Sequence, residues 1–278
     1  VNLSERQFND PAVATEVANV LAETGLPPGL LKTGRNEFLV RIVSRDAETF
    51  FPEVKFGETA TLQVEYDRRY LYEYTGAQFS ALTSAVVAAF MLAIWWFRRT
   101  DLLYLLFGLT CGFWSLRTWT YLTESVPWAW WWEWRAMYNV WIGCFALSVA
   151  AFFLSYIDRL VRRWRVALLA YAFAGPLLLV LSRGALQTVV ARYWIGGLFV
   201  LELYVLWCFA LWLRRNRSIE GFGLAGAALA TFLLAANDFG VRSGWLPYSN
   251  PYAIHFGAPV VMLAMGALLA ARFVRALR

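Results

Sequence analysis

Seven long apolar stretches constrain the fold of this chain more strongly than any other feature of its sequence. At 1.5 Å per residue, a helix of about 20 residues spans the hydrocarbon core of a bilayer, which is about 30 Å thick. The stretches lie at residues 77–97, 102–122, 134–156, 166–181, 193–213, 221–239 and 254–271. The loops between them are short, so we expect consecutive helices to be antiparallel neighbours. The sequence therefore predicts an all-α membrane protein, a seven-transmembrane-helix bundle over residues 77–271.

The composition is that of a membrane protein and not of a soluble globular domain. Of the 278 residues, 60% are hydrophobic, only 16% are charged and 15 are tryptophan. The net charge is +6, but acidic residues outnumber basic ones in residues 1–76, so the basic excess belongs to the membrane part. An excess placed there indicates the lipid bilayer as a partner and does not favour nucleic-acid binding.

The arginines of the membrane part are distributed unevenly between the two sets of loops. One set, together with the C-terminal tail, carries Arg98, Arg99, Arg159, Arg162, Arg163, Arg165, Arg214, Arg215, Arg217, Arg272, Arg275 and Arg278. The opposite set and the helix ends near it carry Arg135, Arg183, Arg192 and Arg242. Cytoplasmic loops are enriched in Lys and Arg. We therefore expect the N-terminus outside, the C-terminus in the cytoplasm, and residues 272–278 at the start of a cytoplasmic linker.

The first 76 residues differ from the rest and predict a small β-containing extracytoplasmic segment. Residues 36–44 and 60–68 alternate apolar and polar side chains in the manner of strands. Two strands alone bury too little apolar surface to form a stable sheet. Either the segment is the remnant of a larger β domain, or its strands lean on the membrane helices. Because the chain opens at Val1 without an initiator Met or a signal peptide, we expect it to be a piece of a longer protein.

Several kinds of membrane chemistry are not expected from these residues. A retinal protein needs a lysine in a membrane helix, and the only lysines, Lys32 and Lys55, precede the first apolar stretch. One histidine cannot form a multi-histidine metal site. The three cysteines lie within apolar stretches, where we expect them to pack as small apolar residues. We therefore expect no metal, no cofactor and no enzymatic activity within this chain.

Polar residues inside the apolar stretches form the candidate site. Glu202 lies near the middle of residues 193–213, where a carboxylate costs several kcal/mol unless it is paired, hydrated or protonated. Arg117 and Glu202 differ in depth by about 6 Å along their helices. We expect Arg117 to satisfy Glu202, directly or through a water, with Asp238 as the competing partner. The whole candidate network is Arg117, Arg135, Asn139, Glu202, Asn237, Asp238 and His255.

Two interpretations of this polar network remain open. The first is that its members hold helices together, because interhelical polar contacts are common in membrane proteins. The second is that they line a cavity, open outward, which holds a ligand or a structural water network. The sequence favours the first interpretation without excluding the second.

Small side chains recur at four-residue spacing at the start of the sixth stretch. Gly223 with Ala227, and Gly226 with Ala230, each lie on one face of the expected helix. Such spacing predicts a close approach of two helices. A surface for a homodimer is the alternative.

Five segments of the sequence resemble parts of a known family. LLKTGRNEFLVRIVSRD (30–46), FPEVKFG (51–57) and YDRRYLYEY (66–74) resemble the last strands of an extracellular jelly-roll domain that leads into a first membrane helix. FRRTDLLYLLFGLTCGFWSLRTWTYL (97–122) and GWLPYSNPYAIHFGAPVVMLAMGALLAARF (244–273) resemble the second helix and the seventh helix with the turns before them. On these segments the chain is similar to bacterial seven-transmembrane receptors with diverse intracellular signalling modules.

This resemblance implies a receptor in the bacterial inner membrane. In the family, the bundle relays a signal from an outer carbohydrate-binding-like domain to a cytoplasmic histidine kinase, diguanylate cyclase or similar output domain. A small ligand, a carbohydrate by analogy, and an output domain are therefore the implied partners, and no kinase or cyclase residues carry over. The alternative is a membrane transporter or channel with a polar site around Glu202 and Arg117. Pro176 and Pro259 do not form the internal repeat that is common in transporters.

Overall fold

The computed structural model describes residues 59–99, 101–123, 126–246 and 254–277. The chain forms two compact units, Val1–Tyr74 and Thr75–Arg278. In the first unit the described part consists of helix α3 (Thr59–Tyr70) and most of a π-helical turn, η2 (Leu71–Thr75).

The prediction of a strand at residues 60–68 is wrong, because this segment is part of helix α3. The Gln63 side chain donates a 2.9 Å hydrogen bond to Asp67, and the rings of Tyr66 and Tyr70 stack with centroids 6.1 Å apart. Both contacts join residues four apart, which are neighbours only on a helix. The apolar alternation was therefore too short to identify a strand. The strand expected at residues 36–44 lies outside the described residues, and no strand occurs within them.

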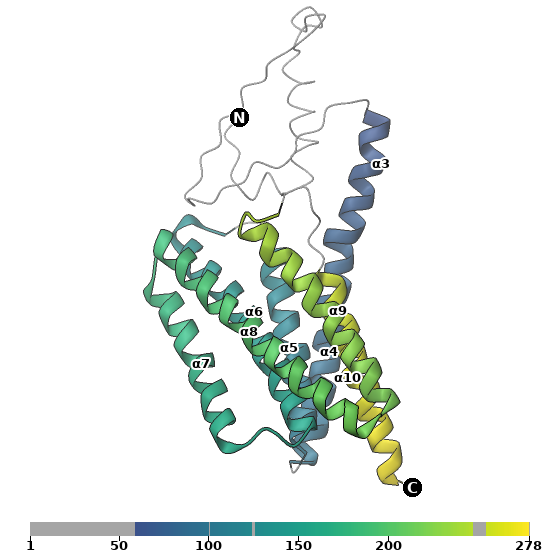
Figure 1. Cartoon of the computed structure of the whole chain (residues 1–278). Coiled ribbons are helices and arrows are strands. Elements are labelled where there is room, and N and C mark those ends of the chain that lie inside the picture. The colour runs from purple at the N-terminus through teal and green to yellow at the C-terminus, as the bar shows by residue number, and fades with distance from the viewer. Residues whose placement is uncertain (1–58, 100, 124–125, 247–253, 278) are drawn as a thin grey trace, which may run out of the picture. The chain divides into compact units, whose positions relative to one another are not determined.

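The second unit is a bundle of long helices, shown in Figure 1. Each predicted apolar stretch corresponds to one helix. In chain order these helices are α4 (Gly76–Phe97), α5 (Leu102–Leu122), α6 (Trp131–Tyr156), α7 (Arg162–Leu181), α8 (Ala185–Asn216), α9 (Ile219–Arg242) and α10 (Ile254–Leu277). A 3-10 turn, η3 (Trp128–Trp130), precedes α6. The largest difference from expectation is α8, which begins eight residues before the predicted start at residue 193.

Six of the described helices are long and apolar enough to cross a membrane: α4, α6, α7, α8, α9 and α10. Their outward side chains are apolar, since Phe79 and Leu263 are each 73% exposed. Polar side chains lie inside instead, with Arg117 4% exposed and Asn139 fully buried. An apolar surface around a polar interior is expected when the solvent is lipid. The protein is therefore a multi-pass membrane protein.

Helix α5 is not among these six candidates, although its 21 residues make it nearly as long as α4. Its C-terminal half carries Arg117, Thr118 and Thr120, which lower its apolar content. All three are buried in the bundle. A helix covered by its neighbours needs less apolar surface than one that faces lipid.

Five helices form a closed ring at the centre of the bundle. Helix α5 packs against α6, α6 against α8, α8 against α9, α9 against α10, and α10 against α5. Helix α4 packs outside this ring against α5 and α10, while α7 packs outside it against α6 and α8. Figure 1 shows α7 at one edge of the bundle. The ring surrounds the space in which the candidate site lies.

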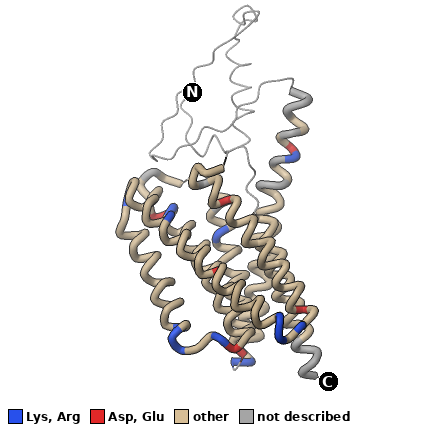
Figure 2. Tube along the Cα trace, viewed as in Figure 1, with Lys and Arg blue, Asp and Glu red and all other residues tan. Residues whose placement is uncertain are grey.

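Arginines gather at one end of the bundle. Figure 2 shows basic residues concentrated at the end where α4, α6 and α8 finish. Arg214 and Arg215 lie in the last turn of α8, and Arg98 directly follows α4. The arginine-rich loops predicted from the sequence therefore lie at a common end.

Trp194 fills the space between α6, α7 and α8. A Cβ atom added at Gly143 on α6 or at Gly175 on α7 would overlap the indole ring of Trp194. The Tyr171 hydroxyl donates a 2.6 Å hydrogen bond to the Trp194 backbone oxygen. The two glycines thus allow α6 and α7 to approach a large aromatic side chain of α8.

The small residues near the start of α9 do not produce the expected close packing. Gly223, Gly226 and Ala230 are exposed, and a Cβ atom at either glycine would have no neighbour within 4 Å. Only Ala227 of the predicted pairs is buried. Instead, α9 turns the face that carries Leu224 toward the bundle. In lipid both faces of a helix can be apolar, so residue spacing alone does not identify the packed face.

Candidate functional site

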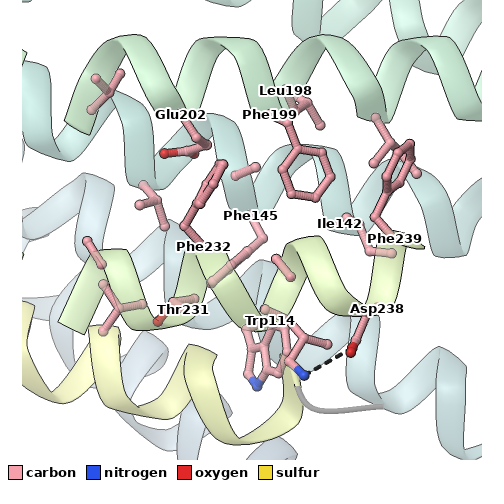
Figure 3. A pocket seen from close by; sticks show the side chains of 18 of the residues that line it. Trp114, Ile142, Phe145, Leu198, Phe199, Glu202, Thr231, Phe232, Asp238 and Phe239 are labelled. Atoms are coloured by element: carbon pink, nitrogen blue, oxygen red, sulfur yellow. Dashed lines mark hydrogen bonds between the residues drawn. The ribbon is translucent and has the colours of Figure 1, made fainter. Parts of the chain in front are cut away.

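A cavity of about 170 Å³ lies within the ring of α5, α6, α8, α9 and α10. Most of its lining is aliphatic or aromatic, and Figure 3 shows several of these side chains around it. The polar members of the lining are Arg117, Tyr138, Glu202, Thr231 and Asp238. The structure therefore brings together three members of the predicted network, Arg117, Glu202 and Asp238, around one mainly apolar space.

Arg117 connects three helices of the ring. Its Nη1 atom lies 3.0 Å from Nδ1 of His255 on α10, and its Nη2 atom donates a 2.9 Å hydrogen bond to the Tyr138 hydroxyl on α6. The guanidinium carbon also lies 5.0 Å from the centre of the Trp114 ring, within the range of a cation–π interaction. His255 is thus brought into the site through Arg117.

Asp238 joins α9 to the start of α10. Its Oδ2 atom accepts a 3.0 Å hydrogen bond from the backbone N–H of Ile254, the bond drawn in Figure 3. Its Oδ1 atom accepts a 3.2 Å hydrogen bond from the Asn237 amide. The first N–H groups of a helix have no partner within the helix, and a carboxylate also interacts favourably with the helix dipole there. Asp238 therefore acts as a cap supplied by a neighbouring helix.

A second polar bond joins α9 and α10 close to this cap. The Thr231 hydroxyl lies 2.7 Å from the backbone oxygen of Gly257. A Cβ atom at Gly257 would lie 3.1 Å from Cα of Thr231, so the missing side chain lets the two helices approach closely. Thr231 also lines the cavity.

Glu202 lines the cavity from α8 without a polar contact to the described residues. It shares one helical face with Leu198, Phe199, Val205 and Leu206, which also line the cavity. The direct ion pair expected with Arg117 is not present, since Arg117 is directed toward His255 and Tyr138. Figure 3 shows Glu202 and Asp238 at separate places in the lining, so they do not form a carboxylate pair.

Arg135 and Asn139 belong to a different group, between α6 and α8. Nη2 of Arg135 donates a 2.8 Å hydrogen bond to the Thr188 hydroxyl, and the Asn139 amide donates to the Arg135 backbone oxygen at 2.9 Å. Nearby, Nε2 of Gln187 donates to the backbone oxygens of Trp132 and Leu179 at 2.9 and 3.0 Å. The bonds of Arg135 and Gln187 hold helices together, whereas that of Asn139 lies within α6, and none of these residues lines the cavity.

Sequence reasoning missed four polar residues of these groups: Tyr138, Thr231, Gln187 and Thr188. Tyr138 lies three residues after Arg135, and Thr231 lies seven residues before Asp238, so helical spacing from predicted members was a usable signal. Gln187 and Thr188 precede the predicted apolar stretch and gave no such signal. Among the described residues, no group of three or more His, Cys, Asp or Glu side chains could hold a metal ion.

Comparisons with known protein families, curated proteins and solved structures find no match for this chain.

Proposed function

We propose that this chain is the membrane module of a receptor in the bacterial inner membrane, with its N-terminus outside and α10 leading to a cytoplasmic output domain. The sequence resemblance supports this proposal, and so does the arginine-rich end of the bundle from which α10 emerges. In this proposal α5 is a seventh span, and a histidine kinase or diguanylate cyclase type of domain receives the signal. The outer segment contributes to recognition of a small ligand, with a carbohydrate as the implied class.

The observation that carries the proposal is the concentration of polar contacts on the first turn of α10. His255 contacts Arg117 of α5, the N–H of Ile254 is bound by Asp238 of α9, and the carbonyl of Gly257 is bound by Thr231 of α9. A shift of α5 or α9 would therefore be transmitted to α10. Small translations or rotations of packed helices are a common form of signalling transition.

Fusion of the chain to a reporter output domain tests this function. A histidine kinase or diguanylate cyclase domain is joined after Arg278, and the basal output is measured for His255→Leu, which removes the polar contact of Arg117 on α5 with α10. Tyr171→Phe is the matched control, because it removes one interhelical hydrogen bond between α7 and α8, away from α10. We expect His255→Leu to change the output at least severalfold at equal expression, and Tyr171→Phe to leave it unchanged. Equal outputs from all three proteins would contradict the proposal.

A transporter or channel is the second candidate, and the cavity favours it. Glu202 and Arg117 both line a central space, and ionisable residues inside a membrane mark ion pathways in many transporters. Proteoliposomes loaded with a pH-sensitive dye test this candidate for protons. Proton flux that depends on the protein and is lost in Glu202→Gln would favour transport over signalling.

A further inference from the structure

We infer that the cavity within the bundle is a binding site for a small apolar molecule that carries one amine, with its ammonium group against Glu202. This site lies inside the membrane module and is separate from any recognition by the outer segment. It would serve a receptor or a transporter equally, so it goes beyond the function proposed above.

The first argument is the position of the Glu202 side chain. Residues 198, 199, 202, 205 and 206 of α8 all line the cavity at spacings of three and four, so Glu202 shares the cavity-facing side of its helix. Phe199, one turn before Glu202 on α8, and Phe232 on α9 line the same cavity (Figure 3). No described residue donates a hydrogen bond to this carboxylate or forms an ion pair with it. A carboxylate in an apolar environment is costly unless a partner satisfies it.

The second argument is the charge of the lining. The charged side chains that line the cavity are two carboxylates, Glu202 and Asp238, and one guanidinium, Arg117. Asp238 already accepts hydrogen bonds from Ile254 and Asn237. The net formal charge of the lining is therefore −1. Glu202 is the carboxylate that still needs a partner. A ligand with a single positive charge complements it.

The third argument is the aromatic surface of the cavity that Glu202 lines. Phe199 on α8 packs against Phe232 and Phe239 on α9, with ring centroids 5.6 and 5.0 Å apart. All three rings line the cavity. Aromatic faces attract ammonium groups, and a carboxylate beside them adds a direct ionic contact. The combination favours an organic ammonium over a strongly hydrated metal cation.

The volume of the cavity matches a ligand of about one substituted ring. An apolar cavity of about 150 Å³ can hold one benzene molecule. The space here is about 170 Å³. A second hollow, lined by α8 and α9 residues, shares Leu206 with the cavity.

Two probes of nearly the same shape test the inference on the full chain purified in a non-ionic maltoside detergent. They are 2-phenylethylamine, whose amine is protonated at neutral pH because alkyl amines titrate near pH 10, and propylbenzene, which has a methyl group in its place. The measurement is the midpoint of thermal unfolding as a function of probe concentration. The proteins compared are wild type, Glu202→Gln, and Glu220→Gln, the last being the same change at an exposed site near the start of α9.

We expect 2-phenylethylamine to raise the midpoint of the wild type and of Glu220→Gln, because a ligand that binds only the folded state stabilises it. In Glu202→Gln the same shift should require at least a tenfold higher amine concentration. Propylbenzene should act equally on all three proteins. An equal amine response in Glu202→Gln would overturn the inference, and so would the absence of any response to either probe.

A cavity-filling variant keeps the test decisive if Glu202→Gln does not fold. Ala228 is buried and lines the cavity. Ala228→Val should weaken the response to both probes at least tenfold, since it occupies the space that the ring needs. An undiminished response would place the probes elsewhere and overturn the inference. Loss of both responses when phospholipid is added would show that an acyl chain occupies the cavity instead, and would also overturn it.

Discussion

The Arg117 guanidinium lies 3.0 Å from Nδ1 of His255 and thereby joins α5 to the first turn of α10. A guanidinium can only donate hydrogen bonds, so the ring nitrogen that faces it accepts. The same side chain donates to the Tyr138 hydroxyl on α6. One buried cation thus positions three of the five helices that surround the cavity.

Loss of the His255 ring should therefore destabilise the bundle. In His255→Leu the guanidinium of Arg117 loses an acceptor in a buried place, and an unsatisfied buried group costs about 1–3 kcal/mol. We expect a loss of that size in the free energy of unfolding, measured in detergent with a chemical denaturant. The double variant Arg117→Met with His255→Leu should recover part of it, because the cation is removed as well.

The matched control for this prediction is Tyr138→Phe. It removes one hydrogen bond to the same guanidinium but keeps the aromatic ring, whose centroid lies 5.3 Å from the guanidinium carbon. Its loss should be smaller than that of His255→Leu. If the double variant is no more stable than His255→Leu alone, the unsatisfied cation is not the source of the loss.

Asp238 should control the stability of the first turn of α10. Asp238→Ala removes the acceptor for the Ile254 N–H, and loss of a helix cap costs about 0.5–2 kcal/mol. Hydrogen–deuterium exchange should therefore be faster in peptides that contain the start of α10. Asp238→Asn should show less acceleration, because its amide oxygen can still accept the bond. Equal exchange in all three proteins would show that the cap is not needed.

The proposal that α5 crosses the membrane predicts opposite exposure of its two ends. In a variant without Cys111, Cys144 and Cys208, single cysteines replace Arg99, before α5, or Thr123, after it. We expect a membrane-impermeant thiol reagent applied to whole cells to label position 123 and not position 99. A cysteine added after Arg278 should behave like the one at position 99. Labelling of both ends of α5 from the same side of the membrane would contradict the proposal that the bundle has seven spans.

The helices of the bundle were predictable because hydropathy alone identifies long apolar segments. The predicted bounds of the second span coincide with those of α5, and those of the first differ from α4 by one residue. The start of α8 was missed because Gln187 and Thr188 are polar. The Gln187 amide nitrogen donates to Trp132 and the Thr188 hydroxyl accepts from Arg135, and such bonds to a helix far away in the sequence leave no local pattern.

The membership of the candidate site was partly predictable, but its pairings were not. Position along a helix gives the depth of a side chain, and Arg117 and Glu202, which were expected at similar depths, both line the cavity. Depth does not give the direction in which a side chain points around its helix. Arg117 points toward His255 on α10 and Asp238 toward the start of the same helix. These directions depend on helix rotation and packing, which the sequence does not specify by itself.

The packing around Trp194 predicts opposite effects for two glycine substitutions. In Gly175→Ala the added methyl group would overlap the indole ring, and overpacking of this kind costs about 1–3 kcal/mol. Gly196→Ala, on α8 itself, meets no atom within 4 Å and should be neutral or stabilising by about 0.5–1 kcal/mol, since alanine favours the helix. Thermal unfolding of the two variants in the same detergent checks this difference. If Gly175→Ala is as stable as Gly196→Ala, the indole ring can move aside at little cost.

The last prediction concerns the relation between Glu202 and Arg117. If they formed a buried ion pair, removal of either partner would cost about 3–5 kcal/mol, and the double variant would recover much of that loss. The structure directs Arg117 to His255 and Tyr138, so we expect Glu202→Ala to cost less than about 1 kcal/mol. The effects of Glu202→Ala and Arg117→Met should then add to within about 0.5 kcal/mol in a double-mutant cycle, as for sites that do not interact. A coupling energy well above that value would show that the two side chains interact, through a water or directly, and would leave no free carboxylate for an amine.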